Sequence, residues 1–256
     1  MTKHTAEKPD YGNWVSKKII YTCAITTIFF AGVSVVFWPV IVGAVLCLIP
    51  LIYFAYSYYE FSDEGGNLQS KIRGLVLKHV DWDGNGQGRA LDIGCGNGAL
   101  TIEVAKRYRN VQVIGVDYWG GRWDYSKRVC QKNASIEGVD ERTTFQKASA
   151  SALPFGEEWF DLAISNFVFH EITDAGDKRE VIREALRVVK KGGKFAFQDL
   201  FLSKRLYGEI DDLLETIERW GVRKVEFTNT SKEGFIPDLL RPPFMMGSIG
   251  IIYGTK

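Results

Sequence analysis

The most prominent pattern along the chain is a long apolar stretch near its start. No residue from Ile19 to Tyr59 is charged. A helix of about 20 residues crosses a bilayer core of about 30 Å, so the stretch is about twice as long as one spanning helix. We expect two antiparallel membrane helices, Ile19–Phe37 and Val40–Tyr59. The break should fall at Trp38-Pro39, because proline is well tolerated in the first turn of a new helix.

The residues that flank this stretch predict its orientation. Lys17 and Lys18 precede the first helix, Lys71 and Arg73 follow the second, and the tip of the hairpin carries no lysine or arginine. Positive residues favour the cytoplasmic side, so we expect a membrane protein whose catalytic domain faces the cytoplasm. A cleavable signal peptide fits poorly, since the run is too long and no cleavage site follows it. A pair of buried helices in a soluble fold is the remaining alternative.

Beyond the apolar stretch, short strand-like and helix-like patterns alternate. The expected strands are Arg89–Ile93, Val111–Val116, Thr143–Lys147, Phe160–Ser165, Lys194–Gln198, Val222–Phe227 and Ser248–Tyr253. The expected helices are Asn67–Val80, Ala99–Tyr108, Gly121–Glu137, Lys178–Val189 and Leu206–Trp220. Such alternation predicts an α/β fold with a mostly parallel sheet and helices on both faces. We therefore expect a tail over residues 1–18, a transmembrane hairpin over 19–59 and a catalytic domain over 60–256.

Charge and cysteine content narrow the possible partners. The net charge is +1, whereas nucleic-acid-binding domains are usually clearly basic, so no nucleic-acid partner is expected. The four cysteines, Cys23, Cys47, Cys95 and Cys130, show no CxxC pair or regular spacing. Neither a disulfide framework nor a zinc site is indicated, and no acidic triad suggests catalytic magnesium, so no metal is expected.

The clearest candidate site is a glycine-rich turn between a strand and a helix. Gly94, Gly96 and Gly98 allow a sharp turn and a close approach of the backbone to a ligand, and the turn ends at a helix N-terminus, where amide groups point outward. Asp117 ends the next strand. A carboxylate in that place can accept hydrogen bonds from two ribose hydroxyls.

Four motifs in order give these residues a family resemblance. Leu91–Gly98, Val113–Asp117, Leu153–Phe155 with Phe160–Asn166, and Arg187–Gly193 resemble the motifs of class I S-adenosylmethionine-dependent methyltransferases. The resemblance implies a Rossmann-like, seven-stranded sheet with a reversed last strand, and S-adenosylmethionine as cofactor. A nicotinamide-dependent oxidoreductase is a weak alternative because its loop is usually GxGxxG, whereas this loop is GxGxG. A membrane protein that binds the cofactor without turnover is a further alternative.

The resemblance also implies roles for single residues. Asp92 is expected to anchor the cofactor's ammonium group directly or through water, and Tyr118 or Trp119 to pack on adenine. Ser149 stands where many relatives carry an acid that binds the adenine amino group. The expected cofactor-binding residues are Asp92, Gly94, Cys95, Gly96, Gly98, Asp117, Tyr118, Trp119, Ser149, Ala150 and Asn166.

The expected chemistry is in-line transfer of an activated methyl group. The enzyme must align a nucleophile behind the methyl carbon and exclude water, and it needs a base only if the acceptor arrives protonated. His170, beside Glu171, and Asp199 follow strands four and five and are the catalytic candidates, although His170 could equally have a structural role. The absence of an Asn/Asp-Pro-Pro-aromatic motif after strand four lowers the expectation of a nucleobase target.

The acceptor is expected to be a small molecule that is either lipophilic or presented at the membrane surface, and membrane lipid is expected as a further partner. Between Asp199 and Val222 there is one expected helix, which leaves little chain for a lid over the acceptor. The segment before the glycine loop, which begins at the membrane, should then supply the cover. Simple tethering by the hairpin is the alternative, and the acceptor atom and the oligomeric state stay open.

Overall fold

The computed structural model describes residues 7–84, 87–120 and 125–256 and contains two compact units. One unit is Asn13–Ile72. The other joins the N-terminal segment up to Gly12 with Arg73–Lys256. These limits differ from the expected boundaries at residues 18 and 59, because the segment before Asn13 packs with the second unit rather than with the hairpin. Residues 1–6 of the expected tail lie outside the described residues.

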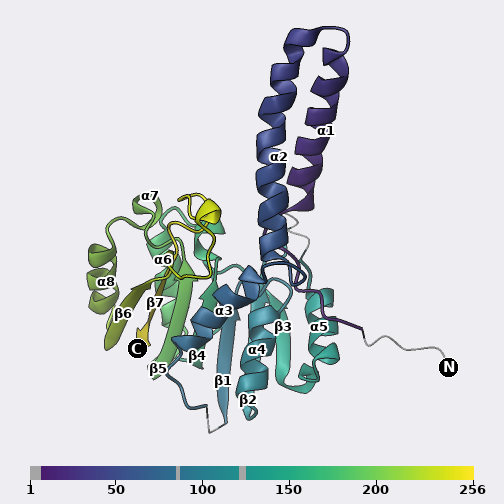
Figure 1. The fold of residues 1–256 in the computed structure, drawn as a ribbon. Coiled ribbons are helices and arrows are strands. Elements are labelled where there is room, and N and C mark those ends of the chain that lie inside the picture. The colour runs from purple at the N-terminus through teal and green to yellow at the C-terminus, as the bar shows by residue number, and fades with distance from the viewer. Residues whose placement is uncertain (1–6, 85–86, 121–124) are drawn as a thin grey trace, which may run out of the picture. The chain divides into compact units, whose positions relative to one another are not determined.

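The first unit is a helical hairpin. Helix α1 (Lys17–Ser34) and helix α2 (Ile41–Phe61) are joined by a short 3₁₀ helix, η1 (Trp38–Val40) (Figure 1). The break falls at Trp38-Pro39, where the sequence placed it. Small residues on α2 let the helices approach, since a Cβ on Gly43 would lie 3.0 Å from the ring of Phe30 and Ala44 is buried.

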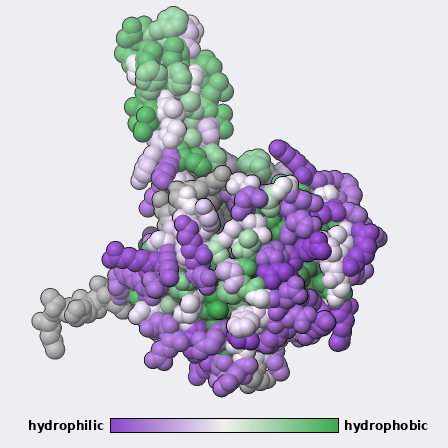
Figure 2. Space-filling model, turned by 180° about the vertical axis from the view of Figure 1, so that it is seen from behind, coloured by the Kyte–Doolittle hydropathy of each residue, from purple (hydrophilic) through white to green (hydrophobic). Residues whose placement is uncertain are grey.

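The hairpin exposes apolar side chains all around both helices. Figure 2 shows hydrophobic colouring on one face of the hairpin towards its tip, and Val36, Ile28 and Leu46 are 92%, 71% and 63% exposed. Among the described residues, one helix, Trp38–Phe61, is long and apolar enough to cross a membrane. Helix α1 is 18 residues long and begins with two lysines. The expected hairpin of two spanning helices is therefore supported by one candidate span.

The base of the hairpin is closed by the residues that precede α1. Asn13 donates from Nδ2 to the carbonyl oxygen of Tyr58 at 3.0 Å. The rings of Trp14 and Phe61 lie 5.5 Å apart, and Val15 and Phe61 are buried. The two ends of the hairpin are thus held together by packing as well as by the turn at its tip.

The second unit is built on a seven-stranded sheet with the order β3-β2-β1-β4-β5-β7-β6 (Figure 1). The strands are β1 (Gly88–Ile93), β2 (Val111–Asp117), β3 (Thr143–Lys147), β4 (Phe160–Asn166), β5 (Val189–Asp199), β6 (Lys224–Asn229) and β7 (Gly250–Thr255). Strand β7 pairs antiparallel with both β5 and β6, and all other pairs are parallel. The expected Rossmann-like sheet with a reversed last strand is confirmed.

Helices cover both faces of this sheet. The residues of α3 (Leu68–Lys78) from Arg73 onward, α4 (Ala99–Arg107) and α5 (Lys127–Ile136) share one apolar cluster, which includes Val76, Ile102 and Ala134. On the other face, α6 (Lys178–Arg187), α7 (Lys204–Tyr207) and α8 (Ile210–Arg219) contribute to a second cluster with Phe195 and Phe197. Three short 3₁₀ helices complete the unit: η2 (Asp140–Arg142), η3 (Phe169–Glu171) and η4 (Asp238–Leu240).

Three expected elements differ from the structure. The helix expected over Leu206–Trp220 is two helices, because Gly208 adopts a φ of +76° and the Arg179 guanidinium bonds the carbonyl of Tyr207 beside it. The helix expected to reach Val189 ends at Arg187, since β5 already begins at Val189, which pairs with Phe160. The helix expected over Gly121–Glu137 begins at Lys127, since the Ser126 side chain caps it by accepting from the Val129 amide; residues 121–124 lie outside the described residues.

The topology brings several connections to the carboxyl edge of the sheet. Strand β1 lies between β2 and β4, so the strand order reverses beside β1. In open α/β sheets, ligands bind at the carboxyl edge beside such a reversal. Asp199, Gly250 and Asn229 are register partners, so the 20-residue connection 230–249 between β6 and β7 lies at this same edge. The expectation of little material for a lid is therefore wrong, because it counted only the chain before Val222.

Candidate cofactor and acceptor site

The glycine loop leaves β1 at the carboxyl edge and ends at α4. Gly94, Gly96 and Gly98 all have positive φ, at +73°, +56° and +85°. A Cβ on Gly94 would lie 2.0 Å from a methyl carbon of Val168 in the turn after β4. Glycine is thus required there both by the backbone angle and by a close neighbour.

Asp117 holds the glycine loop from the end of β2. Its Oδ2 accepts from the Gly96 amide at 2.9 Å, and its Oδ1 accepts from the Trp119 amide at 2.8 Å. Burial raises the pKa of Asp117, while these backbone amides lower it. Each carboxylate oxygen can accept more than one hydrogen bond, so Asp117 can shape the loop and still receive hydroxyl donors from a ribose.

Asp92 lies beneath the loop. It is 1% exposed, and its Oδ2 accepts from the Thr101 hydroxyl on α4 at 2.6 Å. Burial raises the pKa of Asp92 to about 7, and the nearby carboxylate of Asp117 adds to this. Thr101, which the sequence did not single out, therefore orients the carboxylate that we expect to face the ammonium group.

The two aromatic candidates after β2 have different surroundings. The indole of Trp119 donates from Nε1 to the carbonyl of Gly96 at 2.9 Å, and its φ is +45°. Tyr118 is 61% exposed, and Lys147 Nζ lies 4.9 Å from its ring centre. Trp119 thus supports the loop, which leaves Tyr118 as the more accessible surface for an adenine ring.

A carboxylate from a distant part of the chain accepts a hydrogen bond from the connection after β3. Ser149 donates to Asp174 Oδ2 at 2.8 Å and lies 2.8 Å from the Ser151 hydroxyl, while Ala150 is buried beside it. Hydrogen bonds from these serines hold the pKa of Asp174 below its usual value. The sequence could not reveal Asp174, because it lies 25 residues away from Ser149.

The turn after β4 is held by Asp199 at the end of β5. Asp199 Oδ2 accepts from the amides of Val168 and Phe169 at 3.0 and 2.8 Å, and Asp199 is 0% exposed. The turn contains Phe167 with a φ of +59°, which is uncommon for a bulky residue. The structure therefore places Asp199 as a buried support of this turn rather than as a group that faces an acceptor.

His170 forms an ion pair with Asp199. His170 Nδ1 lies 2.8 Å from Asp199 Oδ1, and Nε2 lies 3.5 Å from Glu171 Oε1. Burial alone would lower the pKa of His170, but the two carboxylates raise it to about 10. Burial acts to raise the pKa of Asp199, yet His170 and backbone amides lower it. A protonated imidazole donates hydrogen bonds and cannot accept a proton, so this arrangement argues against His170 as a general base.

Two amide oxygens at this edge have no hydrogen-bond donor among the described residues. Asn166 and Gln198 are register partners on β4 and β5, and both Asn166 Oδ1 and Gln198 Oε1 are buried without a donor. Gln198 Nε2 is held by Thr230 Oγ1 at 3.2 Å. A buried, unsatisfied carbonyl costs about 1–3 kcal/mol, so these oxygens fit a site that receives donors from a bound molecule. Gln198 and Thr230 were not identified from the sequence.

The N-terminal segment is fastened to the glycine loop. Asn133 on α5 accepts from the Asp10 amide at 2.9 Å and donates to the Asp10 carbonyl at 2.8 Å. The same Nδ2 donates to the carbonyl of Asn97 at 2.9 Å. Gly12, with a φ of +72°, lies against the side chains of Tyr125 and Asn97. Residues more than 80 positions apart in sequence thus form one wall of the loop.

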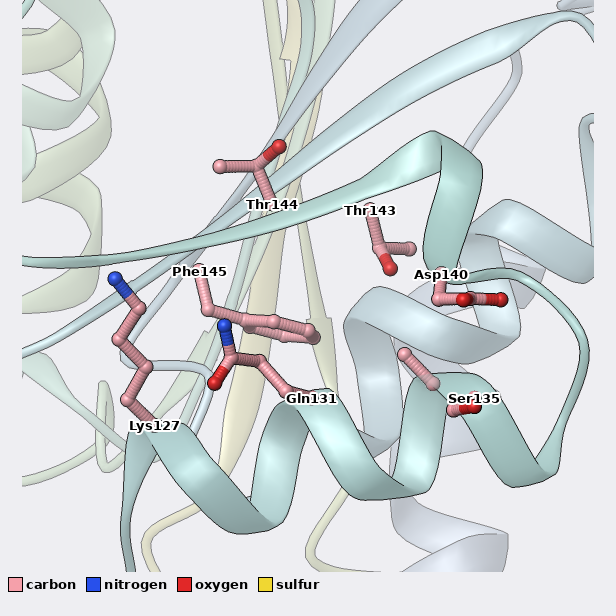
Figure 3. A pocket seen from close by; sticks show the side chains of 8 residues that line it. Lys127, Gln131, Ser135, Asp140, Thr143, Thr144 and Phe145 are labelled. Atoms are coloured by element: carbon pink, nitrogen blue, oxygen red, sulfur yellow. The ribbon is translucent and has the colours of Figure 1, made fainter.

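Other features lie apart from this edge. A polar groove between α5 and β3 is lined by residues that include Lys127, Gln131 and Thr143, and Figure 3 shows Phe145 between the strand and the helix. This groove flanks β3, which is the outer strand at one end of the sheet. Over the described residues, no His, Cys, Asp and Glu cluster is arranged to hold a metal ion, and Cys95 and Cys130 are free and buried.

Comparison with known proteins identifies the chemistry of this loop. A family profile described as a methyltransferase domain matches residues 90–193. Residues 90–193 therefore resemble a methyltransferase domain. S-adenosylmethionine is the cofactor of such a domain, so the expected enzyme class and cofactor are confirmed for this part of the chain. The backbone fits the group as well, because the glycine loop turns sharply through positive φ at Gly94, Gly96 and Gly98, and Asp117 lies beside it at the end of β2.

Individual relatives cover part of the chain. The 27-O-demethylrifamycin SV methyltransferase of Amycolatopsis mediterranei is 35% identical over 116 residues, 44% of this chain and 39% of that protein. The demethylmenaquinone methyltransferase of Roseiflexus castenholzii is 32% identical over 110 residues, 43% of this chain and 41% of that protein. The chain therefore spans less than half the length of these two relatives.

A solved structure agrees in fold. Phosphoethanolamine N-methyltransferase 2 of Haemonchus contortus, in complex with S-adenosyl-L-methionine, has a TM-score of 0.55 at 18% identity, and the match covers 77% of this chain and 56% of that one. At this identity the match supports the sheet and its helices, and it leaves the acceptor open.

Proposed function

We propose that the chain is a membrane-anchored, S-adenosylmethionine-dependent methyltransferase that methylates a small, lipophilic acceptor at the membrane surface. The observation that carries the activity is the glycine loop held by Asp117 inside a methyltransferase domain. The anchor is supported by a hairpin with apolar side chains on every side. Both curated relatives described above are named for small-molecule substrates, which supports a small-molecule acceptor.

In this proposal each part of the carboxyl edge has one task. Asp117 receives the ribose hydroxyls, and the loop from Gly94 to Gly98 lies along the cofactor. When bound, S-adenosylmethionine supplies a methyl group activated by a positive sulfur. The turn from Asn166 to His170, held by Asp199, forms the wall opposite the loop. The enzyme then contributes alignment and exclusion of water rather than a proton acceptor.

Asp199 and His170 act in this scheme through position and charge. With His170 protonated, the group formed by His170, Asp199 and Glu171 carries a net charge of about −1. A negative surface beside the methyl group favours a neutral or cationic acceptor over an anionic one. Asn166 Oδ1 and Gln198 Oε1 supply acceptor oxygens for a hydroxyl, amine or amide hydrogen of the same molecule.

The membrane proposal rests on the hydroxyl groups of the hairpin as well as on its apolar surface. Thr22, Thr26 and Thr27 each donate to a backbone carbonyl within α1 at 2.7–2.9 Å. Ser34 on α1 and Ser57 on α2 donate to backbone carbonyls of their own helices at 2.6 and 2.8 Å. These hydroxyls need no water, as burial in lipid requires. Lys17 and Lys18 at the start of α1 support an orientation with the catalytic unit on the cytoplasmic side.

Two measurements on the full chain test this proposal. Purified protein in phosphatidylcholine nanodiscs is given cofactor with a labelled methyl group and a fractionated lipid extract or a water-soluble metabolite extract. We expect label in the lipid fraction, and no transfer by Asp117→Ala. Transfer only to water-soluble compounds would refute the lipophilic acceptor. Cofactor binding without transfer to either fraction would favour the alternative of a binding protein without turnover.

A further inference from the structure

The connection between β6 and β7 displays two large apolar side chains to solvent. Leu239 is 54% exposed and Phe244 is 71% exposed. Over the described residues of the catalytic unit, the other large apolar side chains with comparable exposure are Tyr118 and Trp159. Leu239 and Phe244 lie five positions apart in one connection, so this loop carries two exposed apolar side chains, here called the apolar pair.

This loop is held in a defined conformation. Its inner side chains Ile236, Leu240, Met246 and Ile249 are buried. The Met246 amide donates to the Leu240 carbonyl at 3.0 Å, and the Gly247 amide donates to the Pro242 carbonyl at 3.1 Å. The outward direction of the apolar pair is thus built into the fold. An apolar side chain held in place in this way loses little conformational freedom when it is inserted into another phase.

The loop is attached to the active-site edge at both of its ends. Near its start, Thr230 accepts from Gln198 at 3.2 Å. Near its end, the Ser248 carbonyl accepts from the Leu202 amide at 3.0 Å, just beyond Asp199. Both ends of the connection that carries the apolar pair are therefore bonded to residues at the active-site edge.

The charge of the loop indicates which kind of surface fits. It carries two basic residues, Lys232 and Arg241, and two acidic residues, Glu233 and Asp238, and Arg241 pairs with Asp238 at 2.7 Å. This balance provides no excess of cations for anionic lipids or nucleic acid. Two side chains are also far fewer than the roughly 20–30 residues on each side of a stable protein interface, whereas insertion into a lipid interface needs only exposed apolar side chains.

We propose that the β6–β7 connection is a second membrane contact, in which Leu239 and Phe244 enter the boundary between headgroups and acyl chains of a zwitterionic bilayer. The inference rests on the proposed membrane function, in which the hairpin brings the catalytic unit to the bilayer. It adds that the carboxyl edge itself meets the lipid, so a lipophilic acceptor passes directly from the bilayer to the residues after β4 and β5.

Photocrosslinking of the full chain in phosphatidylcholine vesicles tests this contact. The photoreactive residue p-benzoylphenylalanine replaces Phe244 or Leu239 in separate variants. The matched control is the same replacement of Trp159, an exposed aromatic residue that precedes β4 at the opposite edge. Replacement of Val36 at the tip of the hairpin reports insertion of the anchor. We expect lipid adducts at 244 and 239 and none above the unirradiated background at 159.

The outcomes separate the inference from the proposed function. Adducts at 36 without adducts at 244 or 239 would overturn the second contact and keep the anchor. No adducts at any of these positions would overturn both. Crosslinks from 244 to a second copy of the chain would show a protein interface instead. Adducts at 244 that require added phosphatidylserine would contradict apolar insertion, because the loop would then depend on anionic headgroups.

Discussion

His170 lies 2.8 Å from Asp199 through its Nδ1 atom, and the same carboxylate accepts the amides of Val168 and Phe169. One buried side chain on β5 thus sets both the shape of the turn after β4 and the protonation state of its histidine. The pair raises the pKa of His170 and so favours its protonated form at neutral pH.

The first prediction concerns this charge. Asp199→Asn should lower the pKa of His170 from about 10 toward its ordinary value of about 6.5. Titration of the His170 ring by NMR measures it. Glu171→Gln is the control and should lower the pKa less, because Glu171 is more exposed and its oxygen is 3.5 Å away. A His170 that titrates near 6.5 in the unaltered protein would contradict the ion pair and restore the general base.

The same pair sets a pH window for stability. Because the folded pKa of His170 is raised, its contribution is complete below pH about 6.5 and is lost as the pH rises through about 10. The folded pKa of Asp199 is lowered, so its contribution is complete above pH about 4 and is lost as the pH falls through the folded pKa. Urea unfolding at several pH values should show both losses in the unaltered protein. Asp199→Asn should lack the acid loss and show a smaller alkaline loss, because Glu171 still raises the pKa of His170.

The second prediction concerns cofactor binding by Asp117. Asp117→Ala removes an acceptor for ribose hydroxyls and two loop amides, and each charge-assisted bond contributes about 1.5–3 kcal/mol. Titration calorimetry should show S-adenosylmethionine affinity weakened by at least about tenfold. Asp161→Asn is the control, since Asp161 bonds Lys190 and the Arg89 amide beside the opposite ends of the strands. Equal affinities of the two variants would refute the role of Asp117.

The third prediction concerns the contact between the glycine loop and the turn after β4. Gly94→Ala should greatly weaken cofactor binding, because the new Cβ would lie 2.0 Å from Val168. Adding Val168→Gly should restore part of the affinity, because it removes all three Val168 carbons that the new Cβ would meet at 2.0–2.8 Å. We expect the recovery to be incomplete, because alanine at the positive φ of position 94 still destabilises the loop by about 1–2 kcal/mol. Gly156→Ala, at a glycine with open space around it, should bind normally. No recovery in the double variant would refute the steric explanation.

The fourth prediction concerns the N-terminal segment. Asn133→Leu keeps a similar volume but loses two bonds to Asp10 and one to Asn97, each contributing about 0.5–1.5 kcal/mol. Hydrogen exchange should show a loss of protection at the Asp10 amide, together with weaker cofactor binding. Lys132→Ala, which removes an exposed ion pair with Glu7, should change neither. Retained protection at Asp10 in Asn133→Leu would show that the segment is held by other contacts.

The fifth prediction concerns the hairpin. Leu46 is 63% exposed near the middle of the candidate span, and a lysine at the centre of a membrane helix costs about 2.5–3.5 kcal/mol. Leu46→Lys should therefore increase extraction of the protein from membranes by alkaline carbonate. Gln131→Lys on the exposed side of α5 is the control for charge. If the two variants and the unaltered protein are extracted equally, α2 is not held in lipid.

The sequence alone determined the local elements and the cofactor loop. Alternating apolar patterns reveal a strand or a helix without knowledge of its neighbours, and the turn at Trp38-Pro39, the glycine positions and Asp117 all follow from local backbone chemistry. The errors were also local in origin. A helical pattern continued through Gly208, and the start of β5 at Val189 was hidden until its pairing with Phe160 was known.

Only the tertiary structure decided what the residues around the loop do. Three sets of contacts join residues at least 25 positions apart: Asp174 with Ser149, Asn133 with Asp10 and Asn97, and Asp199 with His170. The last of these contacts raises the pKa of His170. Hydrogen bonds of this kind depend on which strand ends meet at one edge, and no sequence window contains both partners. The charge state of His170 follows from burial beside a carboxylate, which is a property of the folded arrangement and not of the residue.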